Sequence, residues 1–188
     1  PAVARVARDY FGLVPGSFEL IVGDGRWYLN KTEAKYDAVI LDAFVGDGSP
    51  SHLMSREAFE SARRVLKPEG ALVINTFVDF ESPGDYTGTS LYKTLSAVFP
   101  SVLVHGARGA NTIFVASLRP ELTVLKEPDF RRVHPQAVAE VRSAFAGSWK
   151  PEAGKGIVLT DDFNPVEYYD AANREILRRQ LAMTMQTM

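Results

Sequence analysis

The chain has 188 residues, of which 46% are hydrophobic, and a formal net charge of −2 at pH 7. This length and composition allow one globular domain with a substantial core. The slight negative charge argues against a general nucleic-acid-binding surface, which needs a clustered basic face, so no nucleic-acid partner is expected.

Cysteine is absent, which excludes disulfides, thiolate metal sites and a catalytic thiol and fits a reducing compartment. The three histidines lack partners at metal-ligand spacing, so we expect no metal. We find no secretion signal and no apolar run long enough to span a bilayer, and therefore expect a cytoplasmic protein.

Helices and strands alternate in the first part of the chain. Apolar periodicity and turn residues predict, in order, a helix over Pro1–Phe11, a strand over Phe18–Val22, a helix over Arg26–Asn30, a strand over Ala38–Asp42, a helix over Ser55–Leu66, a strand over Ala71–Phe77 and a helix over Ser90–Phe99. Ser55 is a natural N-cap, and residues 67–70 are expected to form a turn. This alternation is typical of a three-layer α/β fold with a mostly parallel sheet.

Two more strands, Val102–Gly106 and Thr112–Leu118, are joined by a tight connection that predicts an antiparallel hairpin at one edge of the sheet. After Arg119 the chain becomes more polar and is punctuated by prolines, with helices expected near 136–145 and 168–181. We therefore expect a Rossmann-like domain over residues 1–119 and a helical extension over residues 120–188 that packs on it.

Two acidic residues stand out because of their position. Asp42 falls at the carboxyl end of a buried strand, where open α/β sheets bind their ligands, and Asp47 follows in a loop rich in glycine, serine and proline. Two carboxylates so placed suit recognition of a cationic amine and removal of its proton. The alternative is that both are solvated loop aspartates. Asp24 and Gly25 lie in a predicted strand-to-helix turn, and Trp27 is expected to pack under the sheet, with stacking on a base as the alternative.

Three segments of this chain resemble the polyamine (spermidine) synthase family, which has the class I S-adenosylmethionine-type fold. They are Val22–Leu29, Tyr36–Asp42 with its following loop, and Phe59–Gly70. The resemblance implies that Asp24 and Gly25 bind the adenine of decarboxylated S-adenosylmethionine, or of S-adenosylmethionine. It implies that Asp42 contributes to cofactor binding and catalysis, and that Asp47 binds and deprotonates an amine. The tail Thr160–Glu167 resembles one bacterial branch, including members fused to membrane helices, which makes Asp162 a candidate amine contact.

The chain also departs from the family pattern. The family has two residues between its loop acids, so Val45 occupies the simple alignment position of the catalytic acid, and Asp47 replaces it only if the loop is folded differently. The family's glutamine at the end of the next strand is replaced by Asn75 or Thr76. The family's glycine-rich cofactor loop would lie before Pro1, so we expect a fold incomplete at its N-terminus, in a fragment that binds a nucleoside poorly by itself.

The resemblance implies transfer of an aminopropyl group from decarboxylated S-adenosylmethionine to a primary amine in polyamine biosynthesis, by a homodimeric transferase. Two alternatives stay open at this point. One is methyl transfer from S-adenosylmethionine to a small molecule, and the other is a non-catalytic ligand-sensing or assembly domain with the same fold.

Overall fold

A four-stranded sheet with helices packed on one side forms the centre of the protein. The computed structural model describes residues 2–14, 16, 18–44, 48–78, 80, 86–106, 112–124, 126–152, 156–169 and 171. Its helices and strands are α1 (Ala2–Phe11), α2 (Gly25–Lys31), β1 (Tyr36–Leu41), α3 (Arg56–Val65), β2 (Leu66–Thr76), α4 (Tyr86–Val98), β3 (Ser101–Gly106), β4 (Thr112–Ser117) and α5 (Val138–Ala146). Short 3₁₀ turns cover Ser51–Leu53, Phe130–Arg132 and Pro135–Ala137.

The sheet has the strand order β1-β2-β4-β3. β1 and β2 run parallel, joined by α3, whereas β4 is antiparallel to both β2 and β3. The predicted α/β fold is confirmed, and so is the antiparallel hairpin at one edge of the sheet. The sheet of the described residues is therefore mixed, with β1 as its other edge strand.

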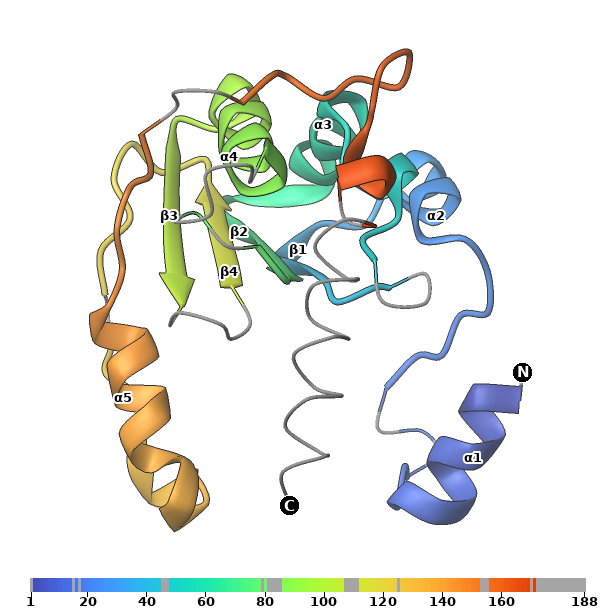
Figure 1. Ribbon diagram of the computed structural model, residues 1–188. Coiled ribbons are helices and arrows are strands. Elements are labelled where there is room, and N and C mark those ends of the chain that lie inside the picture. The colour runs from blue at the N-terminus through green and yellow to red at the C-terminus, as the bar shows by residue number, and fades with distance from the viewer. Residues whose placement is uncertain are drawn as a thin grey trace, which may run out of the picture.

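Alternating side chains of β2 face the helices α2, α3 and α4, which lie on one side of the sheet (Figure 1). Leu72 and Ile74 are fully buried there, in the same core cluster as Phe59 of α3 and Phe114 of β4. Full burial of each such side chain stabilises the fold by about 1.5–3 kcal/mol. Ser55 N-caps α3 by accepting a hydrogen bond from Ala58 N–H, as its sequence position predicts.

The tail segment, which we define as Gly156–Glu167, crosses α4 and α3 on the outside of the helical layer (Figure 1). Thr94 Oγ1 of α4 accepts a hydrogen bond from Leu159 N–H at 2.9 Å, and Leu159 O accepts one from Arg56 N–H at 2.8 Å. Leu159 is fully buried. Because the tail segment forms hydrogen bonds with both helices and buries Leu159, it is part of the folded core.

The structure corrects several predicted elements. Phe18–Val22 forms no strand in the described residues, because the sheet offers it no neighbouring strand to pair with. β2 begins at Leu66, so residues 67–70, predicted as a turn, belong to the strand; a register shift between Tyr36 and Ala38 on β1 accommodates them. α4 begins at Tyr86 rather than Ser90.

Helix α1 ends at Phe11, as predicted, and Gly12 follows it with a φ of 68°, which suits glycine. The helix has no buried residue and lies away from the sheet (Figure 1). The helix predicted over 168–181 falls almost entirely outside the described residues. Among the helices of the described ranges, none has the length and apolar character needed to cross a membrane.

We predict that Gly156→Ala destabilises the protein, because a Cβ at this position would lie 2.4 Å from the carbonyl carbon of Thr89. Overpacking against backbone should lower the free energy of unfolding by about 1–3 kcal/mol or more, measured by urea denaturation. Gly23→Ala is the matched control, since a Cβ there meets no atom within 4 Å. Equal stability of the two variants would contradict the tight seating of the tail segment.

Candidate functional site

Asp24 is held at the N-terminus of α2 by both of its carboxylate oxygens. Oδ1 accepts a hydrogen bond of 2.8 Å from Trp27 N–H, which makes Asp24 the N-cap, and Oδ2 lies 3.0 Å from Nε2 of His52. The hydrogen bond from Trp27 N–H, supported by His52, holds the pKa of Asp24 below its ordinary value. The ionised carboxylate requires the His52 nitrogen to donate, and it is well placed to accept from a ligand amino group.

A cavity of about 530 Å³ lies between residues 19–25 and the open edge of β1, with Asp24 and Gly25 in its wall. Its lining is mostly apolar, including Ile21, Val22 and Ile40. Trp27 also lines it and is 61% exposed, so the expectation that Trp27 packs under the sheet is wrong. The indole is instead available to a ligand or a chain segment in the cavity.

Asp42 and Asn75 meet at the carboxyl ends of β1 and β2. Leu41 is opposite Ile74 in the parallel register, which brings the next residue of each strand together, and Asn75 Nδ2 donates a hydrogen bond of 2.9 Å to Asp42 Oδ1. Asn75 Oδ1 is buried and accepts no hydrogen bond from the protein in the described residues. A buried acceptor beside a carboxylate is suited to bind an N–H donor.

Asp47 lies outside the described residues, so its role stays a prediction. The chain becomes described again at Gly48, and Ser49 Oγ lies 3.0 Å from Thr76 Oγ1 in a buried contact. Ser49, two residues after Asp47, is therefore held at the end of β2.

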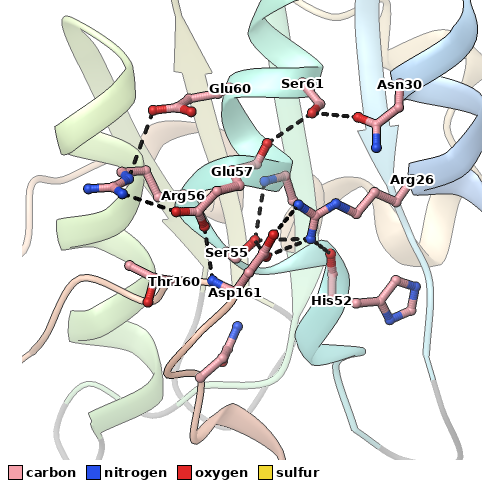
Figure 2. A network of polar contacts seen from close by, with 12 residues as sticks. Arg26, Asn30, His52, Ser55, Arg56, Glu57, Glu60, Ser61, Thr160 and Asp161 are labelled. Carbon is pink, nitrogen blue, oxygen red and sulfur yellow. Dashed lines mark hydrogen bonds and ion pairs between the residues drawn. The ribbon is translucent and has the colours of Figure 1, made fainter.

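A network of polar contacts joins α2, the start of α3 and the tail segment (Figure 2). Arg26 forms a two-pronged ion pair with Asp161, with N–O distances of 2.6 and 2.5 Å. Ser55 Oγ donates to Asp161 Oδ1 at 2.5 Å, and Glu57 Oε2 accepts from Asp161 N–H at 3.0 Å. The tail acid in this network is Asp161, the neighbour of the predicted amine contact Asp162. Both residues are exposed, and the role of Asp162 stays a prediction.

Within the described ranges, no group of three or more histidine or acidic side chains has the arrangement of a metal site. Instead, Asp24 lies in the wall of the cavity, and Asp42 lies beside the amide oxygen of Asn75, which accepts no hydrogen bond in the described residues. Asp24 can accept a hydrogen bond from the amino group of a base, and Asp42 and Asn75 can accept hydrogen bonds from the N–H groups of an amine.

We predict that Asp161→Asn makes the free energy of unfolding depend less on pH in the acid range. Hydrogen bonds from Arg26, with help from Ser55, hold the Asp161 pKa below its ordinary value. The ionised form therefore contributes stability above the unfolded-state pKa near 4, and this contribution is lost as the pH falls through the lower folded-state pKa. Urea unfolding at about pH 6 and about pH 3 should show a smaller loss for the variant than for the wild type.

The control for this measurement is Asp162→Asn, which removes the adjacent carboxylate and leaves the pair with Arg26 intact. A wild-type acid dependence in Asp161→Asn would contradict the stabilising role of the ion pair.

Comparison with known proteins shows the family to which this sequence belongs. Residues 2–103, more than half of the chain, match the spermine/spermidine synthase domain. A polyamine aminopropyltransferase of Vibrio vulnificus is 35% identical over 106 residues, which cover 54% of this chain and 32% of that protein. The chain thus spans about a third of that relative's length.

Solved structures share the fold. A probable spermidine synthase from Corynebacterium glutamicum has a TM-score of 0.58 and 24% identity, covering 74% of this chain and 50% of that one. Human methyltransferase-like protein 13 has a TM-score of 0.55 and 22% identity, covering 78% and 66%. The sequence match over residues 2–103 is more specific than the fold, and from it we conclude that this chain belongs to the spermine/spermidine synthase domain family.

Proposed function

We propose that this chain carries the base-binding and amine-binding acids of an aminopropyltransferase that acts in polyamine biosynthesis. The reaction would move an aminopropyl group from decarboxylated S-adenosylmethionine to a primary amine. The observation that carries this proposal is the pairing of Asp42 with Asn75, whose buried Oδ1 has no protein donor in the described residues, at the ligand-binding end of the sheet. The names of the curated relatives support the same chemistry.

Asp24 and Gly25 would bind the adenine. The Asp24 carboxylate faces the cavity and accepts hydrogen bonds, so it suits the exocyclic amino group of the base. A Cβ at Gly25 would meet no atom within 4 Å, so glycine there leaves open space at the cavity wall. Trp27 offers an exposed aromatic face beside them. Decarboxylated S-adenosylmethionine would supply a sulfonium, which makes the adjacent carbon open to attack.

Asp42 and Asn75 would hold the amine by accepting its N–H groups, with Asp162 as a further proposed amine contact from the tail. The amine nitrogen attacks the carbon next to sulfur, the carbon–sulfur bond breaks, and methylthioadenosine leaves as a neutral product. The proton that the amine loses passes to a carboxylate, for which we propose Asp47, with Asp42 orienting the nucleophile.

The open edge of β1 implies that the working site includes one more strand. β1 is an edge strand and its free side faces the apolar cavity wall, where Ile40 is 67% exposed. An unpaired edge beside exposed apolar side chains is suited to receive a β-strand. We propose that a strand of the longer protein docks there and that its loop binds the rest of the cofactor. The family's homodimer and a fusion to membrane helices are further proposals for that longer protein.

Methyl transfer from S-adenosylmethionine is the alternative, because a methyltransferase-like protein shares the fold. Thermal stabilisation distinguishes the two, since a ligand that binds the native state raises the melting temperature. Larger stabilisation by the decarboxylated compound supports aminopropyl transfer, and no stabilisation by either supports a non-catalytic domain. The protein measured should be the longest natural reading frame that contains this chain.

We predict that Asp24→Asn weakens methylthioadenosine binding by about 10- to 100-fold, since a hydrogen bond to a charged acceptor is lost. Asparagine caps helices as well as aspartate does, so the fold of α2 should be retained. Calorimetric titration measures the affinity and circular dichroism checks the fold. Unchanged affinity in the folded variant would remove Asp24 from the base-binding site.

We predict that Asp42→Asn lowers kcat/KM for amine transfer by about 100-fold or more, because a charged group that orients the nucleophile is lost. Asp37→Asn on the same strand is the matched control. Asp37 lies at the opposite end of β1 and pairs with exposed Lys67, at 2.8 Å. Similar activity of the two variants would exclude Asp42 from the reaction.

A further inference from the structure

Arg26 stands at the junction of three segments that are far apart in the sequence. Its side chain is only 17% exposed, and the guanidinium contacts Asp161 of the tail segment, Ser55 Oγ at the start of α3 and the carbonyl oxygen of His52 at 2.8 Å (Figure 2). It belongs to the first turn of α2, two residues after Asp24. The contacts of this one side chain therefore set where the tail segment and the turn Ser51–Leu53, which we call the His52 loop, lie relative to Asp24.

His52 links Arg26 to Asp24. Its backbone is held by Arg26, and its ring nitrogen lies 3.0 Å from Asp24 Oδ2. The other Asp24 oxygen is occupied by the N-cap hydrogen bond, so the ring of His52 determines how Oδ2 is presented to a ligand. A shift of the His52 backbone would move the ring and change the direction in which that oxygen accepts.

The tail segment also holds the other side of the His52 loop. Asn164 Nδ2 donates to Ser51 O at 2.8 Å, and Glu167 Oε1 accepts from Ser51 Oγ at 2.7 Å. Together with Arg26, these contacts attach both residues 51 and 52 to neighbouring segments. The tail segment lies outside residues 2–103, the part that matches the family domain.

We propose that Arg26 and Asp161 are positioning residues for nucleoside recognition: their ion pair fixes His52 against Asp24 and so aims the Asp24 carboxylate at the amino group of the base. This proposal rests on the proposed function of Asp24. It makes the tail segment a necessary part of the nucleoside site, although none of its residues needs to touch the nucleoside.

The test compares two nucleosides, methylthioadenosine and its inosine counterpart, in which a carbonyl oxygen replaces the exocyclic amino group. Binding of both is measured by calorimetry on the longest natural reading frame that contains this chain, as wild type, Asp161→Asn and Asp161→Glu. We expect the wild type to prefer the adenosine form, and Asp161→Asn to reduce that preference about tenfold by weakening adenosine binding alone. Asp161→Glu, which keeps the charge, should restore part of the preference.

A merely structural role of the ion pair would weaken binding of both nucleosides equally and leave their ratio unchanged, which would overturn the proposal. Asp37→Asn, which breaks an exposed ion pair at the far end of β1, is the control and should leave both affinities unchanged. A wild type that does not distinguish the two nucleosides would overturn the proposed role of Asp24 and this inference with it. A wild type that distinguishes them, with an unchanged ratio in Asp161→Asn, would overturn the positioning role alone.

Discussion

The parallel pairing of β1 with β2 is the constraint on which the candidate site depends. Parallel strands end at the same edge of a sheet, so the register that puts Leu41 opposite Ile74 also puts Asp42 beside Asn75. The same pairing leaves the other side of β1 free, and the cavity follows that side to Asp24. This register thus places the proposed amine-binding pair at the end of β1, and the free edge of the same strand borders the cavity lined by Asp24, the proposed base-binding acid.

The positive charge of Arg26 compensates the charges of the acids around it, which are Asp161, Glu57 and Asp24. Asp161 raises the pKa of Arg26, mainly through their hydrogen bonds, and the charges of Glu57 and Asp24 act in the same direction. Arg26 is therefore the cation shared by these acids. Asp24 is further stabilised by Trp27 N–H at the N-terminus of α2, where the helix favours negative charge. An aspartate that caps a helix and faces a cavity can keep its charge without a dedicated cation, and so remains able to accept from a ligand.

Local signals in the sequence predicted the elements that depend on local interactions. The N-cap role of Ser55, the position of Asp24 before α2 and the hairpin of β3 and β4 all follow from neighbouring residues. The Phe18–Val22 strand was wrong because strand formation requires a partner that the described residues do not provide. The ion pair of Asp161 could not be predicted from the sequence, since its partner Arg26 lies 135 residues away and the adjacent Asp162 carries the same local signal.

The direction of a strand docked on the free edge of β1 decides which of its two flanking loops reaches the candidate site. A strand that runs parallel to β1 ends at the same edge as Asp42 and Asn75, so its following loop emerges beside the Asp24 turn. An antiparallel strand would end near Asp37 and Lys67, at the opposite end of β1. Either direction would bury Ile40 and its apolar neighbours, so hydrophobic burial alone does not select between them. A parallel strand brings the backbone N–H groups of the loop that follows it to this edge, whereas an antiparallel strand brings those of the loop that precedes it. The cofactor-binding loop that we propose can therefore follow the docked strand only if that strand runs parallel to β1.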